Sequence, residues 1–252
     1  GYVSGQELCD RFSVSRTAIW KAVSKLKEEG YEIDSVPNRG YCLLTSPDAM
    51  TEAEIRSYLH TEKMGKSLVC FADTDSTNIQ AKLLAEQNAP DGTLVCSDQQ
   101  TKGRGRRGRA WDSPPGEAIY MSLLLRPDIH PEHASMLTLV MGMAVADAIN
   151  ELMGGESAGI KWPNDVVLKG KKVSGTLTEM STEMDCIHYV VIGTGINVNT
   201  QKFPKELDQA TSLRLAAGHN FRRAELIALC MKYFEKYYAL FERTEDLSLL
   251  ID

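Results

Sequence analysis

Several short segments of the chain are apolar at almost every position, and IHYVVIGTGINV (187–198) is one of them. A strand of this composition is stable only when both of its faces are covered, so it belongs to a sheet packed under helices. Other strands are predicted at 67–72, 93–100, 118–125, 159–168 and 171–180, with helices at 76–87, 134–153 and 223–243. This alternation predicts an α+β domain built on a mixed sheet.

The first 46 residues predict a separate winged helix-turn-helix domain. Ser4 and Glu7 have the spacing of a capping box, and two strands joined by the turn PNRG follow the second helix. The residues that could contact DNA gather at the start of the second helix: Ser15, Arg16, Thr17, Trp20 and Lys21. The six basic and six acidic residues in 1–45 give no net charge, so a small interaction module is the alternative. A polar joint with a short helix (47–66) leads to the larger domain at 67–245.

The overall charge limits the partners that the chain can bind. The net charge is −6 and the sequence pI is about 5.5, so any positive field must be local. Six scattered cysteines without a CxxC pair indicate reduced thiols in a cytoplasmic protein. No apolar run approaches membrane-spanning length and no signal peptide opens the chain, so we expect no membrane partner.

The segment TKGRGRRGRAW (101–111) is the exception to this acidic background. Five cationic side chains and three glycines occupy 102–109, a composition that would repel itself in a helix and weaken pairing in a strand. We therefore expect a loop, called here the arginine loop (101–111). It could be a basic arm for nucleic acid or a mobile loop that closes on a small anion.

Other polar segments interrupt the apolar pattern. STN (76–78) stands at a helix start. Ser76 is expected to cap the helix through its hydroxyl, and the free backbone N–H groups there can also hold a carbonyl or an anion. In KWPND (161–165), Pro163 predicts a kink or a sheet edge that exposes the two polar residues after it, or simply a structural turn. KGKKVSG (169–175) predicts a hairpin turn, and the glycines of GTGINVN (193–199) indicate a close backbone approach. The sequence has no P-loop, dinucleotide fingerprint, GxSxG elbow or histidine cluster, so common acyl and hydride chemistry is unsupported.

These motifs, in this order and spacing, resemble those of the biotin protein ligases: STN, GRGRRGRAW, KWPND followed by KKVSG, and GTGINVN. The N-terminal winged helix makes the chain similar to the bifunctional bacterial class, which is both a ligase and a repressor of biotin synthesis genes. The resemblance covers residues 4–243 and implies a class II synthetase-like catalytic domain. It also implies a winged unit that starts before Gly1 and a small C-terminal β-barrel domain, absent here except for its start at 246–252.

The resemblance also implies roles for individual residues. Lys172 and Arg106 would be catalytic, with Lys172 beside the carboxylate and the α-phosphate. The residues that would bind biotin are Ser76, Thr77, Asn78, Gln100, Arg104, Gly105, Arg106, Lys172 and Gly175. Those that would bind ATP or the adenylate are Arg106, Arg107, Arg109, Trp111, Asn164, Asp165 and Asn197. No metal ligand is assigned, and Mg²⁺ would lie near Asp165.

The implied reaction joins biotin to ATP, giving biotinyl-5′-adenylate and pyrophosphate, and then transfers biotin to a lysine of a biotin carboxyl carrier protein. The carboxylate is already ionised at neutral pH, so the first step needs positioning and charge stabilisation by Lys, Arg and Mg²⁺. The other implied partner is operator DNA, bound by a homodimer that forms with the adenylate. The alternatives are a biotin-sensing repressor without ligase activity, a lipoate-type ligase, and direct nucleic-acid binding by the arginine loop.

Overall fold

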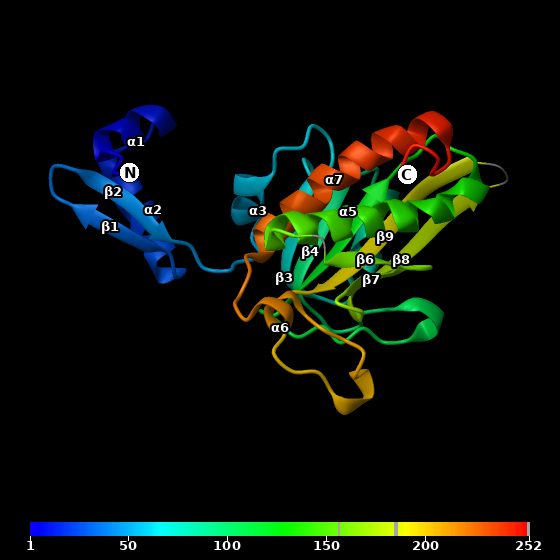
Figure 1. Cartoon of the computed structure of the whole chain (residues 1–252). Helices are drawn as coiled ribbons and strands as arrows, with labels where there is room; N and C mark the ends of the chain where they lie inside the picture. The colour runs from blue at the N-terminus through cyan, green and yellow to red at the C-terminus, as the bar shows by residue number, and fades with distance from the viewer. Residues whose placement is uncertain (156, 184–185, 251–252) are drawn as a thin grey trace. The chain divides into compact units, whose positions relative to one another are not determined.

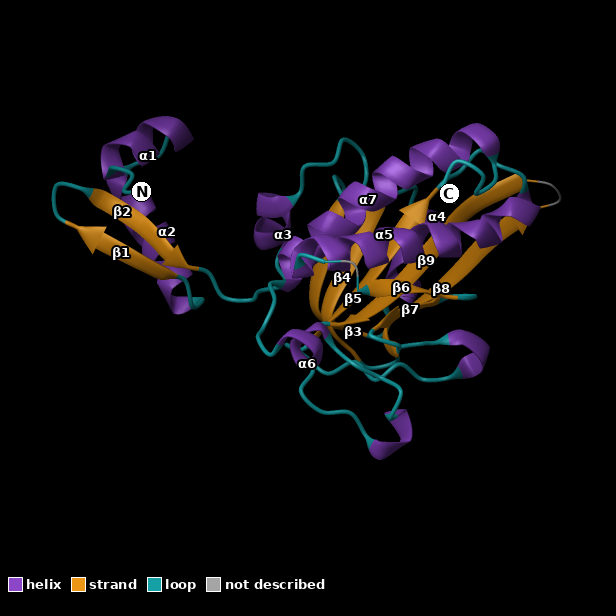
Figure 2. Cartoon of the chain, viewed as in Figure 1, coloured by secondary structure: helices purple, strands orange, loops and turns teal. Residues whose placement is uncertain are grey.

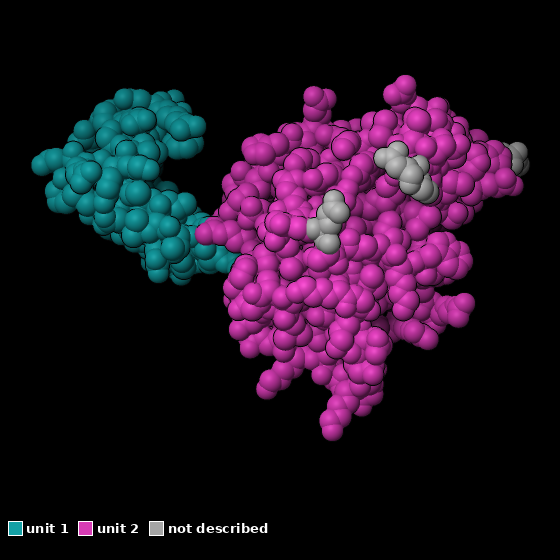
Figure 3. All heavy atoms as spheres, in the orientation of Figure 1, with its two compact units in different colours: residues 1–49 teal, residues 50–252 magenta. Residues whose placement is uncertain are grey.

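The computed structural model of the protein describes residues 1–155, 157–183 and 186–250. The chain divides into two compact units, Gly1–Ala49 and Met50–Asp252 (Figure 3). The larger unit starts inside the joint predicted at 47–66, and its first helix is α3 (Glu52–Tyr58). Of the predicted segment 246–252, residues 251 and 252 lie outside the described part of the chain.

The first unit has the predicted order of two helices followed by a hairpin. Its elements are α1 (Gly5–Phe12), α2 (Arg16–Glu28), β1 (Glu32–Val36) and β2 (Gly40–Thr45). Ser4 and Ser15 cap the two helices, since each hydroxyl accepts a backbone N–H from the first helical turn. β1 and β2 pair antiparallel across the turn that contains PNRG, which confirms the predicted hairpin.

The second unit is built on a seven-stranded sheet in the order β3-β4-β5-β9-β8-β7-β6 (Figure 2). Its strands are β3 (Leu68–Thr74), β4 (Thr93–Gln100), β5 (Ala118–Leu125), β6 (Ala158–Lys161), β7 (Asp165–Leu168), β8 (Lys171–Glu183) and β9 (Cys186–Asn197). Among these described strands β3 and β4 pair in parallel, and every other neighbouring pair is antiparallel. The mixed sheet predicted from the apolar segments is confirmed.

Helices cover both faces of this sheet (Figure 1). They are α4 (Thr77–Glu86), α5 (Leu137–Met153) and α7 (Arg223–Thr244), and the short α6 (Leu213–Ala217) lies beyond the ends of the strands (Figure 1). Val95, Leu124 and Val191 pack with α4, whereas their neighbours along the strands pack in the larger core with α5 and α7. Successive strand residues point to opposite faces, so a sheet covered on both sides requires apolar residues at consecutive positions.

Residues 131–153 form a longer apolar helical stretch than the sequence pattern predicts. It consists of the turn η2 (Pro131–Met136) and α5, and by length and composition alone it could cross a membrane. The expectation that no apolar run approaches that length is therefore wrong. The reason for the composition is packing, because α5 packs on the sheet beside α7 and its apolar residues belong to the larger core.

The predicted strand at 159–168 is two strands, β6 and β7, joined by a tight turn. Lys161 pairs with Asp165, so Trp162, Pro163 and Asn164 form the tip of a hairpin. Pro163 has no N–H to donate to a ladder, which explains why pairing stops there. KWPND forms the structural turn, and Asn164 and Asp165 after Pro163 remain partly exposed, so both interpretations of the motif agree with the structure. The next turn, at Lys169 and Gly170 with φ of 50° and 79°, confirms the hairpin predicted at 169–175.

Candidate functional site

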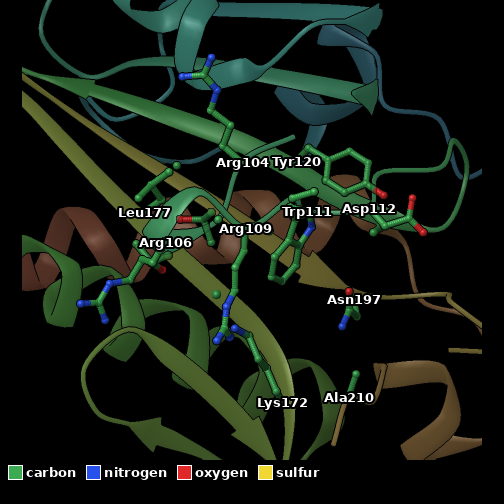
Figure 4. A pocket seen from close by; sticks show the side chains of 18 of the residues that line it. Arg104, Arg106, Arg109, Trp111, Asp112, Tyr120, Lys172, Leu177, Asn197 and Ala210 are labelled. Carbon is green, nitrogen blue, oxygen red and sulfur yellow. The ribbon is translucent and has the colours of Figure 1, made fainter. Parts of the chain in front are cut away.

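A cavity of about 620 Å³ opens at one end of the sheet in the second unit (Figure 4). The carboxyl ends of β3, β4 and β9 meet the starts of β5, β7 and β8 there. All fifteen residues that the family resemblance links to biotin or nucleotide line this cavity. The lining also includes residues that no sequence motif marked, among them Tyr120, Leu177, Lys202, Phe203, Leu207 and Ala210.

The arginine loop is closed on itself by backbone hydrogen bonds. Arg104 and Ala110 form an antiparallel bridge, and the Gly105 N–H donates to the Arg109 carbonyl oxygen at 2.7 Å. Between them Arg107 adopts a φ of 57°, a left-handed conformation that turns the chain sharply. The loop therefore projects as a small hairpin over the cavity.

The cations of the arginine loop point toward two ends of the cavity. Arg106 and Arg109 extend toward the side that holds Lys172, whereas Arg104 extends away from it (Figure 4). Arg106 Nη1 donates a hydrogen bond of 2.8 Å to Asn164 Oδ1, which links the loop to the tip of the β6–β7 hairpin. Two loop arginines and one strand lysine thus gather at the same end of the cavity.

Lys172, at the start of β8, is fixed through both its side chain and its backbone. Its Nζ lies 2.7 Å from Asp165 Oδ1 and 5.4 Å from the centroid of the Trp111 ring. Its N–H donates to the Gln209 carbonyl at 2.7 Å, and its own carbonyl accepts from the Thr211 N–H at 2.8 Å. The Lys172 side chain remains 35% exposed, so a ligand in the cavity can reach the ammonium group.

Side chains lie directly on the strands at Gly193 and Gly195, and less tightly at Gly175. A Cβ at Gly193 would overlap Asn78 Oδ1, and a Cβ at Gly195 would lie 2.5 Å from Trp111 Cε2. Gly175 of β8 pairs with Gly195, and a Cβ there would lie 3.1 Å from the Trp111 ring. The close backbone approach predicted for GTGINVN is confirmed, and the groups that approach are the Asn78 amide and the Trp111 indole.

Polar side chains at the start of α4 form the other end of the cavity. Ser76 is buried as the N-cap residue, but its side chain makes no capping hydrogen bond. Gln100 Oε1 instead accepts from the N–H of Thr77 at 2.9 Å and from its hydroxyl at 3.2 Å. Gln100 Nε2 donates to Ser113 Oγ at 3.0 Å, just beyond the arginine loop. The capping role predicted for the Ser76 hydroxyl is therefore wrong.

Asn78 is held by partners from two strands. Its Oδ1 accepts from Ser122 Oγ at 2.6 Å, and its Nδ2 donates to Glu179 Oε2 at 2.8 Å. Lys82 Nζ donates to the other oxygen of Glu179 at 2.6 Å. Burial raises the pKa of Glu179, but the hydrogen bonds from Lys82 and Asn78 outweigh it and hold that pKa below its ordinary value. Sequence analysis missed Ser122 and Glu179, since single polar residues within strands carry no motif.

The described residues place no group of three or more histidine, cysteine, aspartate or glutamate side chains where it could hold a metal ion. Asp165 lines the cavity and contributes one carboxylate beside Lys172. Mg²⁺ commonly binds one or two carboxylates and completes its shell with water and substrate phosphates. A magnesium ion that arrives with a nucleotide is compatible with this lining.

The residues predicted to contact DNA lie around the start of α2 in the first unit. They are Ser15, Arg16, Thr17, Trp20 and Lys21. Ser15 caps the helix, and Arg16 donates to Gln6 Oε1 at 2.9 Å. The Trp20 side chain is 62% exposed, a large aromatic surface without a place in the small core of this unit.

Comparison with known proteins assigns the two units separately. The biotin/lipoate A/B protein ligase family matches residues 69–197, and an HTH domain family matches residues 1–42. The chain is 47% identical over 240 residues to the bifunctional ligase/repressor BirA of Bacillus subtilis, across 94% of this chain and 74% of that protein. It is 32% identical to the Escherichia coli protein of the same name, across 95% of this chain and 73% of that protein.

A solved structure agrees with these relatives. The biotin protein ligase of Aquifex aeolicus in complex with biotin and ATP matches with a TM-score of 0.61 and 36% identity, over 71% of this chain and 73% of that chain. The sequence comparisons, the mixed sheet and the shared motifs all indicate the same family. The chain therefore belongs to the biotin/lipoate A/B protein ligase family and is similar to its bifunctional ligase/repressor members.

Proposed function

We propose that the chain is a biotin ligase that also represses transcription. It activates biotin with ATP as biotinyl-5′-adenylate and transfers the biotin to a lysine of a biotin carboxyl carrier protein. Its first unit binds operator DNA, with the adenylate as corepressor. The observation that carries the proposal is a single cavity with a hydrogen-bonding pocket at one end and three cations at the other.

The first step brings two anions together. A biotin carboxylate oxygen bonds to the α-phosphorus of ATP as the bond from that phosphorus to pyrophosphate breaks, and no proton has to move. Lys172, Arg106 and Arg109 extend toward the same end of the cavity and would stabilise the negative charge that builds up there. Asp165 holds the Lys172 ammonium in place, and the Arg106–Asn164 hydrogen bond anchors the loop.

The other end of the cavity would take the head of biotin. Gln100 and the 76–78 segment supply amide and hydroxyl groups for the ureido ring, and Gly175 would offer its backbone to the aliphatic tail. The tail would run beside the Trp111 indole, which lies against Gly175 and Gly195, and would deliver the carboxylate to Lys172. The indole would also stand beside the adenine.

The arginine loop would close over the adenylate. A mixed anhydride is hydrolysed readily, so a cover that excludes water protects it until the acceptor lysine arrives. Arginine suits such a cover because its planar guanidinium binds phosphate through two N–H groups and stays charged. Mg²⁺ bound with ATP near Asp165 would neutralise phosphate charge, and the protein would act in the cytoplasm.

The first unit would read DNA through the start of α2. Trp20, Thr17 and Lys21 are exposed there and would face the groove. A homodimer of adenylate-bound chains would present two such helices to a two-fold operator, which couples biotin status to repression. A shift of the protein on operator DNA that requires biotin and ATP together would test this half of the proposal.

The test of the ligase half is incubation with biotin, MgCl₂ and α-³²P-labelled ATP. We expect labelled biotinyl-adenylate to elute with the protein and biotin to pass to a purified carrier domain. Lys172→Ala should reduce adenylate formation far more than biotin binding. Tight biotin binding without transfer would support the sensor instead, and activity with lipoate in place of biotin would support a lipoate-type ligase. Loop-arginine variants that lose DNA binding and keep ligase activity would support nucleic-acid binding by the loop.

A further inference from the structure

Glu179 touches the cavity through a single residue. Its carboxylate is not part of the cavity lining, whereas Asn78 and Leu177 are. Glu179 Oε2 accepts from Asn78 Nδ2 at 2.8 Å, and Glu179 Oε1 accepts from Lys82 Nζ at 2.6 Å. The Lys82 and Glu179 side chains are 34% and 28% exposed, so the pair stands at the border between the pocket and solvent.

The carboxylate fixes which way the Asn78 amide faces. An ionised carboxylate can only accept hydrogen bonds, so the NH₂ group of Asn78 must be the end that faces it. The carbonyl oxygen of Leu177, 3.4 Å from the same nitrogen, is also only an acceptor. The amide oxygen therefore faces the opposite way, where it accepts from Ser122 Oγ at 2.6 Å.

Hydrogen bonds also fix the orientation of the Gln100 side-chain amide. Its Oε1 accepts two hydrogen bonds from Thr77, so its NH₂ group is the donor end. One of its hydrogens goes to Ser113, and the second is free for a ligand. The pocket thus offers an acceptor at Asn78 Oδ1, which has a second lone pair, and a donor at Gln100 Nε2.

We propose that Glu179 and Lys82 are positioning residues that make this pocket specific for a cyclic urea. Glu179 locks the Asn78 oxygen toward a ureido N–H, and Lys82 holds Glu179 in place. A cyclic urea carries N–H donors beside a carbonyl acceptor, which matches the two groups that Asn78 and Gln100 present. This inference rests on the proposed use of biotin, whose head is such a ring.

Without Glu179, the side-chain amide of Asn78 would no longer be held in one orientation. The Ser122 oxygen can accept as well as donate, so it would tolerate an amide turned by 180°. The turned amide would present its NH₂ group to the N–H of the ligand, and two donors repel. The hydrogen bonds from Lys82 and Asn78 outweigh the burial of Glu179 and lower its pKa, and the positive charge of Arg104 in the arginine loop adds to this effect.

The experiment compares Glu179→Leu, Glu179→Gln and Lys82→Met in the full chain by steady-state transfer of biotin to a purified carrier domain. Glu179→Leu should raise the KM for biotin and for dethiobiotin by a common factor of about ten, since one hydrogen-bonded orientation is lost in both. The kcat and the KM for ATP should change less than about twofold, because binding before chemistry is what weakens. Glu179→Gln keeps an acceptor oxygen and should lose only about threefold, with Lys82→Met similar.

Glu183→Leu is the matched control, since Glu183 lies on the same strand with a side chain that is 74% exposed. It should leave all three constants unchanged.

Weak competition by lipoic acid, which lacks the urea, should be equal in wild type and Glu179→Leu. An unchanged biotin KM in Glu179→Leu, or a parallel loss in kcat, ATP KM and lipoic acid binding, would overturn the inference. If Glu179→Leu does not fold, the test is made with Glu179→Gln and Lys82→Met. Both should raise the KM for biotin while kcat and the KM for ATP stay nearly constant. Failure of the wild type to form any adenylate would instead refute the proposed function.

Discussion

Gly195→Ala should slow adenylate formation, because the added methyl group displaces the Trp111 indole. The new Cβ would lie 2.5 Å from Cε2 and 2.7 Å from Nε1 of Trp111, whereas carbon atoms in contact are about 3.5–4.0 Å apart. The indole must therefore move by about 1 Å, and the nearby Lys172 ammonium must adjust with it. Overpacking of this kind lowers the free energy of unfolding by about 1–3 kcal/mol. A misplacement of about 1 Å beside reacting groups can reduce the rate about 100-fold.

The assay is single-turnover release of pyrophosphate at saturating biotin and MgATP, with calorimetric biotin binding beside it. Gly159→Ala is the control, because nothing lies within 4 Å of a Cβ at that position of β6. Combining Gly195→Ala with Trp111→Leu removes the clash, so the double variant should be no slower than Trp111→Leu alone. A Gly195→Ala rate equal to that of the control, or a double variant whose losses simply multiply, would refute the reasoning.

Three other substitutions test packing in the second unit. Gly193→Ala should weaken biotin binding at least about tenfold and cost about 2 kcal/mol of stability, because its Cβ overlaps the Asn78 amide and breaks its hydrogen bonds; calorimetry and urea unfolding measure both. Arg223→Met should cost about 2–3 kcal/mol in urea unfolding, less than for a fully buried pair since its partner carboxylate in β4 is 29% exposed. Glu235 accepts three backbone N–H groups from residues 62–64, which outweigh burial and lower its pKa below 4.5. Its contribution is therefore full above about pH 4.5 and lost as pH falls through the folded-state pKa, so Glu235→Gln should cost about 1–2 kcal/mol at neutral pH and nothing in acid. A cost that stays constant with pH would contradict that assignment.

Local chemistry explains why much of the fold is predictable. A strand buried on both faces is apolar at consecutive positions, so β4 and β5 begin and end where the pattern places them. Ser4 and Ser15 likewise indicate where their helices begin, because an N-cap hydrogen bond needs no partner that is distant in the sequence. Sequence alone also identifies the arginine loop as a loop, since its charges and glycines suit no ladder or helix.

Long-range pairing explains what the sequence leaves open. Gly193 is recognisable as a close approach, but the identity of the group that approaches depends on which helix crosses β9. Ser122 and Glu179 are ordinary polar residues within strands until the sheet order brings both to Asn78. The tip of KWPND is a turn because β6 is only four residues long, and strand length is not encoded in the motif.

The backbone pairing of Lys172 with Ala210 has a consequence for how the cavity can be altered. The segment between β9 and this pairing point contributes Lys202, Phe203 and Leu207 to the cavity wall, and most of it is exposed. Its length can therefore vary at 201–208 to admit a bulkier nucleotide analogue without disturbing the lysine. A deletion at 209–211 would instead remove the two backbone hydrogen-bond partners of Lys172, so an engineered analogue-specific ligase should keep those three residues fixed.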